Sequence, residues 1–199
     1  MTSDPQTTYV DIATRLFAQD GFHGVSLAAL AKEAGVSKQA ILHFFGTKER
    51  LYRAVLSALC DRVCAEIEAT VADDAQEHLA EYYRVMVKGV MASPQDSRLV
   101  IRALLDSDPN ARTWPLKPYL DRLTDLIKAQ PGGSDLSRPA ALAEAYRFIG
   151  AAQYVAISLP TVEGIYGEAM RETFATFFHS RAELEIAQLG KDKSADIGL

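Results

Sequence analysis

The chain has 199 residues, and at about 150 residues per domain this length allows one or two domains. Hydrophobic residues make up 48% and charged residues 24%, which is ordinary for a globular protein and excludes disorder over most of the chain. The formal net charge of −5 argues against a protein that binds nucleic acid nonspecifically over its whole surface, because such proteins are strongly basic.

The charge is spread unevenly along the chain. Residues 1–60 carry six basic and five acidic side chains, whereas the other 139 residues carry fifteen and twenty-one. An acidic protein can therefore contain a small module with different electrostatics.

The bulk composition excludes several further classes. Cys60 and Cys64 are too few for a disulfide framework. Four residues apart on a helix, they are expected to be small apolar residues of a buried stripe. The alternative is a thiol sensor or half a metal site, although no His or Cys nearby in the sequence completes a zinc set. The longest apolar run, residues 148–159, is too short for a bilayer, which needs about 20 residues. The N-terminus has neither the basic region nor the apolar core of a signal peptide. We expect a cytoplasmic protein without membrane, metal or cofactor.

Helical signals recur in the first third of the chain. Residues 7–20 place apolar side chains on one face, and Gly21 follows as a stop. Ser26 is a good N-cap for a short helix over 27–34, which ends at Gly35. Ser37 caps a second short helix over 38–45 that ends at Gly46, and Thr47 caps a long helix from 48 to about 70.

The rest of the chain also reads as helical. Nowhere does the sequence sustain the two-residue alternation of a strand. Prolines and glycines separate further predicted helices at roughly 74–91, 95–107, 113–130, 137–159 and 162–185. The small, polar segment 186–199 is predicted to fray. The fold class is therefore all-α, with eight or nine helices.

The two short helices surround the tetrad Ala34-Gly35-Val36-Ser37. The glycine permits a left-handed turn, the serine starts the next helix at once, and Ala31 is small enough for the helices to approach closely. This is a helix-turn-helix pattern, in which the second helix enters a DNA major groove.

The surrounding residues make the pattern more specific. Leu16-Phe17 with Gly21, then Ala31 and the tetrad, then Phe45, Lys48, Glu49 and Leu51 follow one another in a spacing that resembles the DNA-binding domain of TetR-family transcription regulators. The resemblance implies a dimeric regulator, most often a repressor released from its operator by a small molecule. It implies a DNA-binding domain over 1–47 and a helical ligand-binding and dimerisation domain over 48–185.

The predicted DNA-contacting residues gather on and around the second short helix: Ser26, Ser37, Lys38, Gln39, Ala40, Leu42, His43, Thr47 and Lys48. Gln39 is the candidate for base recognition, because a glutamine amide pairs with both N6 and N7 of adenine. Lys38 and Lys48 are candidate phosphate contacts, and the three hydroxyl residues combine a cap with a phosphate contact. The alternative for each is a solvated side chain or a cap alone. Ile41, Phe44 and Phe45 are expected to pack inward.

One position departs from the family pattern. Leu42 stands where the family usually has a tyrosine three residues before the phenylalanine that Phe45 matches. Leu42 therefore either touches a sugar or a thymine methyl group, or packs. Gln39 and Ala40 also replace small or hydroxyl residues.

Two further sets of residues are expected in the C-terminal part. Candidates for an apolar or aromatic ligand pocket are Tyr82, Met86, Trp114, Tyr119 and Phe148, with His78, Glu81 or Arg102 as a polar anchor; the alternative is that most are core. The last two helices are the expected dimer face, through Ala145, Ala152, Ile157, Ile165, Phe174 and Phe177.

Two other functions fit the sequence less well than a regulator does. An all-helical enzyme finds no support, because the sequence has no phosphate-binding glycine loop, no HExxH, no GxSxG and no zinc-ligand spacing. A protein-interaction module with a purely structural helix-turn-helix leaves Lys38, Gln39 and Lys48 without a role. The predicted partners are operator DNA, a small-molecule effector and a second copy of the chain.

Overall fold

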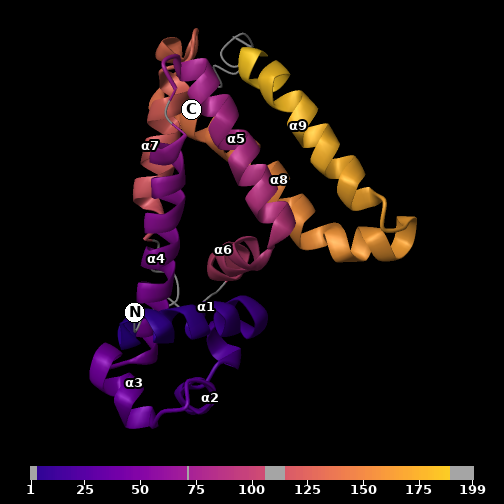
Figure 1. Cartoon of the computed structure of the whole chain (residues 1–199). Helices are drawn as coiled ribbons and strands as arrows, with labels where there is room; N and C mark the ends of the chain where they lie inside the picture. The colour runs from indigo at the N-terminus through magenta and orange to yellow at the C-terminus, as the bar shows by residue number, and fades with distance from the viewer. Residues whose placement is uncertain (1–3, 71, 106–114, 189–199) are drawn as a thin grey trace. The chain divides into compact units, whose positions relative to one another are not determined.

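The computed structural model describes residues 4–70, 72–105 and 115–188, and these contain helices and no strand (Figure 1). The all-α prediction is therefore confirmed. The elements are α1 (Pro5–Gly24), α2 (Leu27–Glu33), α3 (Lys38–Phe45), α4 (Lys48–Ala69), α5 (Ala75–Ala92), α6 (Gln95–Leu105), α7 (Lys117–Lys128), the 3₁₀ turn η1 (Gly133–Asp135), α8 (Arg138–Tyr166) and α9 (Met170–Gln188).

The predicted break at Pro160 is wrong. α8 continues through Pro160 to Tyr166, and the chain turns only at Gly167, whose φ is +97°. A proline inside a helix removes one hydrogen bond and bends the helix. Burial of Ala156 and Leu159 just before it holds this stretch helical, and Figure 1 shows α8 changing direction along its length. Local sequence predicted a stop where packing sustains a bent helix.

Packing divides the chain into two compact units. Unit 1 comprises Met1–Arg62 with Gln95–Leu116, and unit 2 comprises Val63–Pro94 with Lys117–Leu199. The units differ from the predicted boundary after residue 47, because the first part of α4 buries Leu51 and Val55 in the same unit as α1, and α6 packs against α1.

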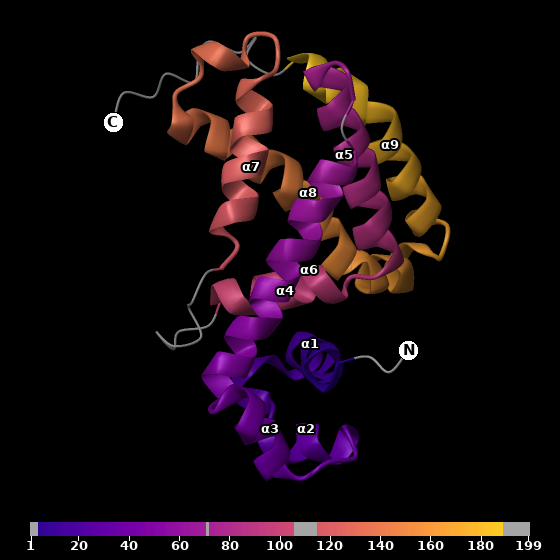
Figure 2. The same cartoon turned by 60° about the vertical axis from the view of Figure 1, so that its left-hand side comes forward.

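Unit 1 is built around aromatic side chains from α1 and α4. The rings of Phe17 and Tyr52 meet edge to face at 4.9 Å between centroids, and Phe22 lies 5.1 Å from Tyr52. Leu30 of α2 and Ile41 of α3 are fully buried, and α2 packs against both α1 and α3. Figure 2 shows α2 and α3 together with α1. The helix-turn-helix thus rests on a well-packed apolar support.

Arg102 of α6 fastens α6 to the end of α1. Its Nε donates to the carbonyl of Ala18 at 3.1 Å and its Nη2 to the carbonyl of Gln19 at 2.6 Å. These carbonyls lie beside Gly21, whose φ of +73° breaks the helical path of α1. A helix end leaves carbonyls without partners, and the guanidinium supplies donors to them. Arg102 is thus engaged within unit 1.

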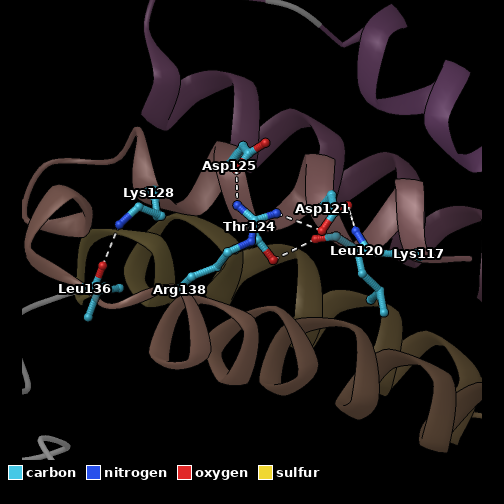
Figure 3. Close-up of polar contacts among 8 residues, drawn as sticks. All are labelled: Lys117, Leu120, Asp121, Thr124, Asp125, Lys128, Leu136 and Arg138. Carbon is cyan, nitrogen blue, oxygen red and sulfur yellow. Dashed lines mark hydrogen bonds and ion pairs between the residues drawn. The ribbon is translucent and has the colours of Figure 1, made fainter.

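Polar contacts join α7 to the start of α8 in unit 2 (Figure 3). Arg138, in the first turn of α8, donates from Nη2 to Asp121 at 2.7 Å and from Nη1 to Asp125 at 2.9 Å. Lys117 also pairs with Asp121, and these hydrogen bonds from Lys117 and Arg138 lower the pKa of the Asp121 carboxyl. Lys128 Nζ donates to the Leu136 carbonyl at 2.5 Å. The side chains of α7 thereby fix the chain where it enters α8.

The connection between α7 and η1 is also tightly packed. A Cβ at Gly133 would lie 2.2 Å from the carbonyl oxygen of Ile127, so only glycine fits there. Gln130 is 3% exposed, and its Nε2 donates to the carbonyls of Ala75 and Leu126. These contacts hold the end of α7 against the start of α5.

α8 is the one helix among the described residues whose length and composition would suit a membrane span, with a mean hydropathy of 1.2 over 18 residues. The sequence had suggested that no apolar run was long enough, and the difference arises because Pro160 does not end the helix. Only 28% of that window is buried within the chain. The packing of unit 2 therefore leaves much of an apolar helix uncovered.

Candidate DNA-binding surface and effector site

The turn between α2 and α3 has helix-turn-helix geometry. Gly35 adopts a φ of +67°, and the amide of Val36 donates to the carbonyl of Ala31 at 2.9 Å. Ser26 and Ser37 are N-caps whose Oγ atoms accept from the amides of Ala29 at 3.0 Å and Ala40 at 3.2 Å. Both predicted cap roles are present, and both serines are exposed. The turn is fixed by local chemistry that the sequence already displays.

α3 has one buried and one solvent-facing side. Ile41 is fully buried and Phe45 is 6% exposed, so these two residues hold the helix to unit 1. Lys38, Gln39 and His43 are exposed, while Ala40 and Leu42 are half-buried. The structure thus brings the polar candidates together on the outer side of one helix.

Phe44 differs from its expected inward packing. Its ring meets Tyr9 of α1 edge to face at 5.4 Å, yet 42% of the residue stays exposed. Two residues earlier in α3, Leu42 is also half in solvent. An apolar group therefore borders the polar face of α3, and the sequence pattern alone did not separate Phe44 from its buried neighbour Phe45.

The start of α4 supplies the remaining DNA candidates. Thr47 precedes the helix, and its Oγ1 accepts from the amide of Arg50 at 3.2 Å, which is an N-cap. Lys48 is half-buried, and its Nζ lies over the ring of Phe22, 4.4 Å from the centroid. This cation–π contact holds the ammonium beside the first turn of α4, where helix amides attract anions. Sequence reasoning did not find the role of Phe22.

Four of the five pocket candidates are buried in unit 2, and Trp114 lies outside the described residues. Tyr82 of α5 donates its hydroxyl to that of Tyr119 of α7 at 2.8 Å, and both residues are buried. Burial, reinforced by Tyr119, raises the pKa of Tyr82, so the phenol stays protonated as a donor. Phe148 of α8 meets Tyr83 edge to face at 5.2 Å, and Met86 is 7% exposed. The described candidates thus belong to the core of one unit.

The three suggested polar anchors are all engaged elsewhere. His78 Nε2 lies 2.8 Å from the carbonyl oxygen of Ile67, Glu81 pairs with Arg84, and Arg102 binds α1. The buried hydroxyl pair of Tyr82 and Tyr119 is a polar feature of the core that sequence reasoning had counted only as aromatic wall.

The predicted dimer-face residues separate into two groups. Ala145 and Ala152 are 0% and 2% exposed, so they pack inside their own chain and are not available to a partner. Ile157 and Phe174 are half-buried, whereas Ile165 is 67% exposed and Phe177 is 47% exposed.

Two tyrosines that the sequence reasoning did not select share the outward side of α8. Tyr146 is 45% and Tyr154 is 68% exposed. Their spacing of eight residues puts them on one face, and Gly150 between them lies on that face as well. The sequence of α8 alone does not show which of its faces is outward. That depends on which residues of α8 pack against the core.

Comparison with known proteins gives the same assignment as the geometry. The family model described as "Bacterial regulatory proteins, tetR family" matches residues 10–55, which span the helix-turn-helix and the start of α4. The HTH-type transcriptional regulator RutR of Escherichia coli K12 is 32% identical over 171 residues, covering 84% of this chain and 80% of RutR. The HTH-type transcriptional repressor ComR of the same strain is 35% identical over 77 residues, 37% of each chain.

Solved structures show the same fold over nearly the whole chain. A TetR-family regulator from Rhodococcus sp. has a TM-score of 0.72 at 18% identity, covering 94% of this chain and 99% of that chain. The ketosteroid transcriptional regulator KstR2 of Mycobacterium tuberculosis has a TM-score of 0.62 at 15% identity, with 93% and 96% covered. Regulators of this family bind operator DNA and small-molecule effectors and are dimers, and they are not enzymes. This chain belongs to the TetR family of helix-turn-helix transcription regulators.

Proposed function

We propose that the protein is a repressor that binds its operator as a dimer through α3 and leaves it when a small apolar or aromatic effector binds unit 2. The main support for DNA binding is that α3 has one buried side and one solvent-exposed side. Ile41 and Phe45 anchor one side, and Lys38, Gln39 and His43 stand in solvent on the other. A recognition helix needs this arrangement, because its outer side chains must reach base edges while the helix is held rigidly.

The positions of the individual side chains support a proposed role for each. Gln39, in the first turn of α3, reads an adenine through its amide, and Leu42 meets a thymine methyl or a sugar. Lys38 and Lys48 contact phosphates, with His43, Ser26, Ser37, Thr47 and the backbone at Ala40 along the same surface. Lys48 is the best-supported phosphate contact because its stacking on Phe22 keeps it at the N-terminus of α4.

The dimer forms, in this proposal, through the outward side of α8 and one edge of α9. Tyr154, Ile165 and Phe177 are large apolar residues that the chain leaves exposed. A stable homodimer interface is apolar at its centre, and a second copy of the same surface would cover these residues. Two recognition helices then stand about 34–36 Å apart, one turn of DNA.

The effector site lies at the core of unit 2, around Tyr82 and Tyr119, with Met86 and Phe148 as apolar contacts. The buried hydroxyl pair supports this choice, because a few polar groups in an apolar site orient a ligand. Binding there shifts the equilibrium toward a conformation whose recognition helices do not match successive grooves. DNA and effector affinities are then reciprocally coupled. A cytoplasmic location belongs to the same proposal.

A mobility-shift titration tests the DNA-binding half. The probe is the DNA upstream of the protein's own gene, and the control is a duplex of the same length with scrambled sequence. We expect specific binding at least a thousandfold tighter than binding to the scrambled duplex, in the range of sequence-specific regulators. Equal affinity for the two duplexes would exclude an operator in that region.

The effector site is tested with a ligand found in a thermal-shift screen of small aromatic compounds. Tyr82→Phe and Tyr119→Phe should weaken its binding, whereas the exposed Tyr146→Phe should not. The same ligand should release the operator, and it should do so at higher concentration for the two core variants. Unchanged operator affinity at saturating ligand would remove that compound as the effector.

A further inference from the structure

A cavity lies between α5 and α9, lined by residues other than those of the proposed effector site. Figures 1 and 2 both show these helices side by side, and they pack against each other within unit 2. The cavity has a volume of about 650 Å³, inside the range of about 300–1,000 Å³ typical of small-molecule sites. Its apolar wall includes Val87 and Met91, both buried, and Ala175 of α9. We call this cavity the α5–α9 groove.

The rim of the α5–α9 groove carries polar side chains from both helices. Lys88 of α5 and His179 of α9 are exposed, and neither has a hydrogen bond or ion pair with any residue that the structure describes. Arg84, one helical turn before Lys88, is held by Glu81, with Nη2 2.8 Å from Oε2. Thr176 and Ser180 add hydroxyl groups from α9. Within the described part of the chain, Lys88 therefore supplies a positive charge without a partner beside an apolar wall.

The charges around a neighbouring cavity favour one end of the groove for the negative group of a ligand. It has a volume of about 500 Å³ and shares Glu81 and Val85 with the groove, but its other charged lining residues are Glu66 and Glu77. Carboxylates at that end repel a negative group and leave the Lys88 end as the favourable place for it.

The groove is also separate from the proposed dimer face. His179 and Phe177 are two positions apart on α9 and so point to opposite sides of that helix. A second copy that covers Phe177 leaves the His179 side open.

We propose that the α5–α9 groove is a second ligand site that binds an amphipathic organic anion, with its apolar body on Val87, Met91 and Ala175 and its negative group at Lys88 and His179. A ligand in this position contacts both helices and stabilises their packing. By linkage, it raises the melting temperature of the protein even when the core site is empty.

Decanoate is the probe, and 1-decanol is its matched neutral counterpart at the same concentration. Titration calorimetry and thermal unfolding of the full chain should show decanoate binding about tenfold more tightly than 1-decanol. Lys88→Met, which removes the charge and keeps the apolar stem, should abolish this preference. Lys32→Met of α2 is the control for loss of one positive charge.

A steric variant makes the test independent of charge. Thr176 is exposed on the wall of the groove, so Thr176→Trp fills the space without disturbing the core. It should abolish decanoate binding and leave operator affinity unchanged, while Tyr82→Phe should bind decanoate as the unmodified protein does. Equal binding of decanoate and 1-decanol, or unchanged binding by Thr176→Trp, would overturn the proposal. Loss of binding in Tyr82→Phe would place the probe in the core site instead and would equally overturn it.

Discussion

α3 and α8 present two kinds of uncovered surface. α3 has eight residues, is anchored through Ile41 and Phe45, and turns polar side chains outward. α8 has 29 residues and leaves Tyr146, Tyr154 and Ile165 in solvent. A polar outer face suits a hydrated, charged partner such as DNA, whereas an apolar outer face suits another protein surface. The contrast supports the proposal that α3 meets DNA and α8 meets a second copy of the chain, so substitutions on the two helices should have different effects.

The largest effect on operator binding is expected from placing charges on the exposed apolar side of α8. Tyr154→Asp combined with Ile165→Asp should convert the dimer to a monomer, because carboxylates would be buried without partners at the centre of the interface. Operator affinity should fall at least a thousandfold, since each chain would bind one half-site alone. Light scattering and a mobility shift measure the two effects. Tyr154→Phe, which keeps the apolar ring, is the matched control, and a double variant that remained dimeric would place the interface elsewhere.

The next effect concerns packing rather than a partner. Gly133→Ala should lower the free energy of unfolding by about 3 kcal/mol, because the new Cβ would collide with the backbone carbonyl of Ile127. Chemical denaturation measures the change. Gly89→Ala is the control: Gly89 lies inside α5 with open space around it, and alanine there should stabilise by up to about 1 kcal/mol. Equal effects at the two positions would contradict the tight turn at Gly133.

A smaller effect is expected from the polar side of α3. Gln39→Ala should lose about 2 kcal/mol of discrimination at one base position in each half-site, with little change elsewhere, because a bidentate amide contact is lost. Selection from a random-sequence library measures the preference at each position. Gln19→Ala on α1 serves as the control for removing an exposed glutamine. The same consensus from Gln39→Ala and the unmodified protein would leave Gln39 without a reading role.

The smallest effect on operator binding is expected from Lys48, at the edge of the proposed DNA-binding surface. Lys48→Ala should reduce the slope of log affinity against log salt concentration by about one, because one phosphate contact is lost, and should leave the base preference unchanged. Binding at several salt concentrations gives the slope, with Lys32→Ala as the control. A slope that did not change would mean that Lys48 serves only to stack on Phe22.

The sequence-based predictions were accurate for features set by local chemistry and less accurate for features set by packing. The caps at Ser26, Ser37 and Thr47 and the end of α3 at Gly46 were predicted from local chemistry, and the structure has them. The assignments of Phe44 and Pro160 were wrong in detail, because partial exposure of a ring and continuation past a proline depend on what packs against them. Ala145 and Ala152 were predicted to lie on the dimer face but are buried in their own chain, since small residues suit a core as well as an interface.

The sequence by itself determined the helical class, the helix-turn-helix and the family, because capping residues, glycine turns and short-range spacing act within a few residues of each other. Only the tertiary structure decided which side of α8 is uncovered, that Arg102 binds the end of α1, and that Lys88 and His179 flank one groove. These features join residues tens of positions apart, and no local pattern encodes them. They depend on the register in which whole helices pack.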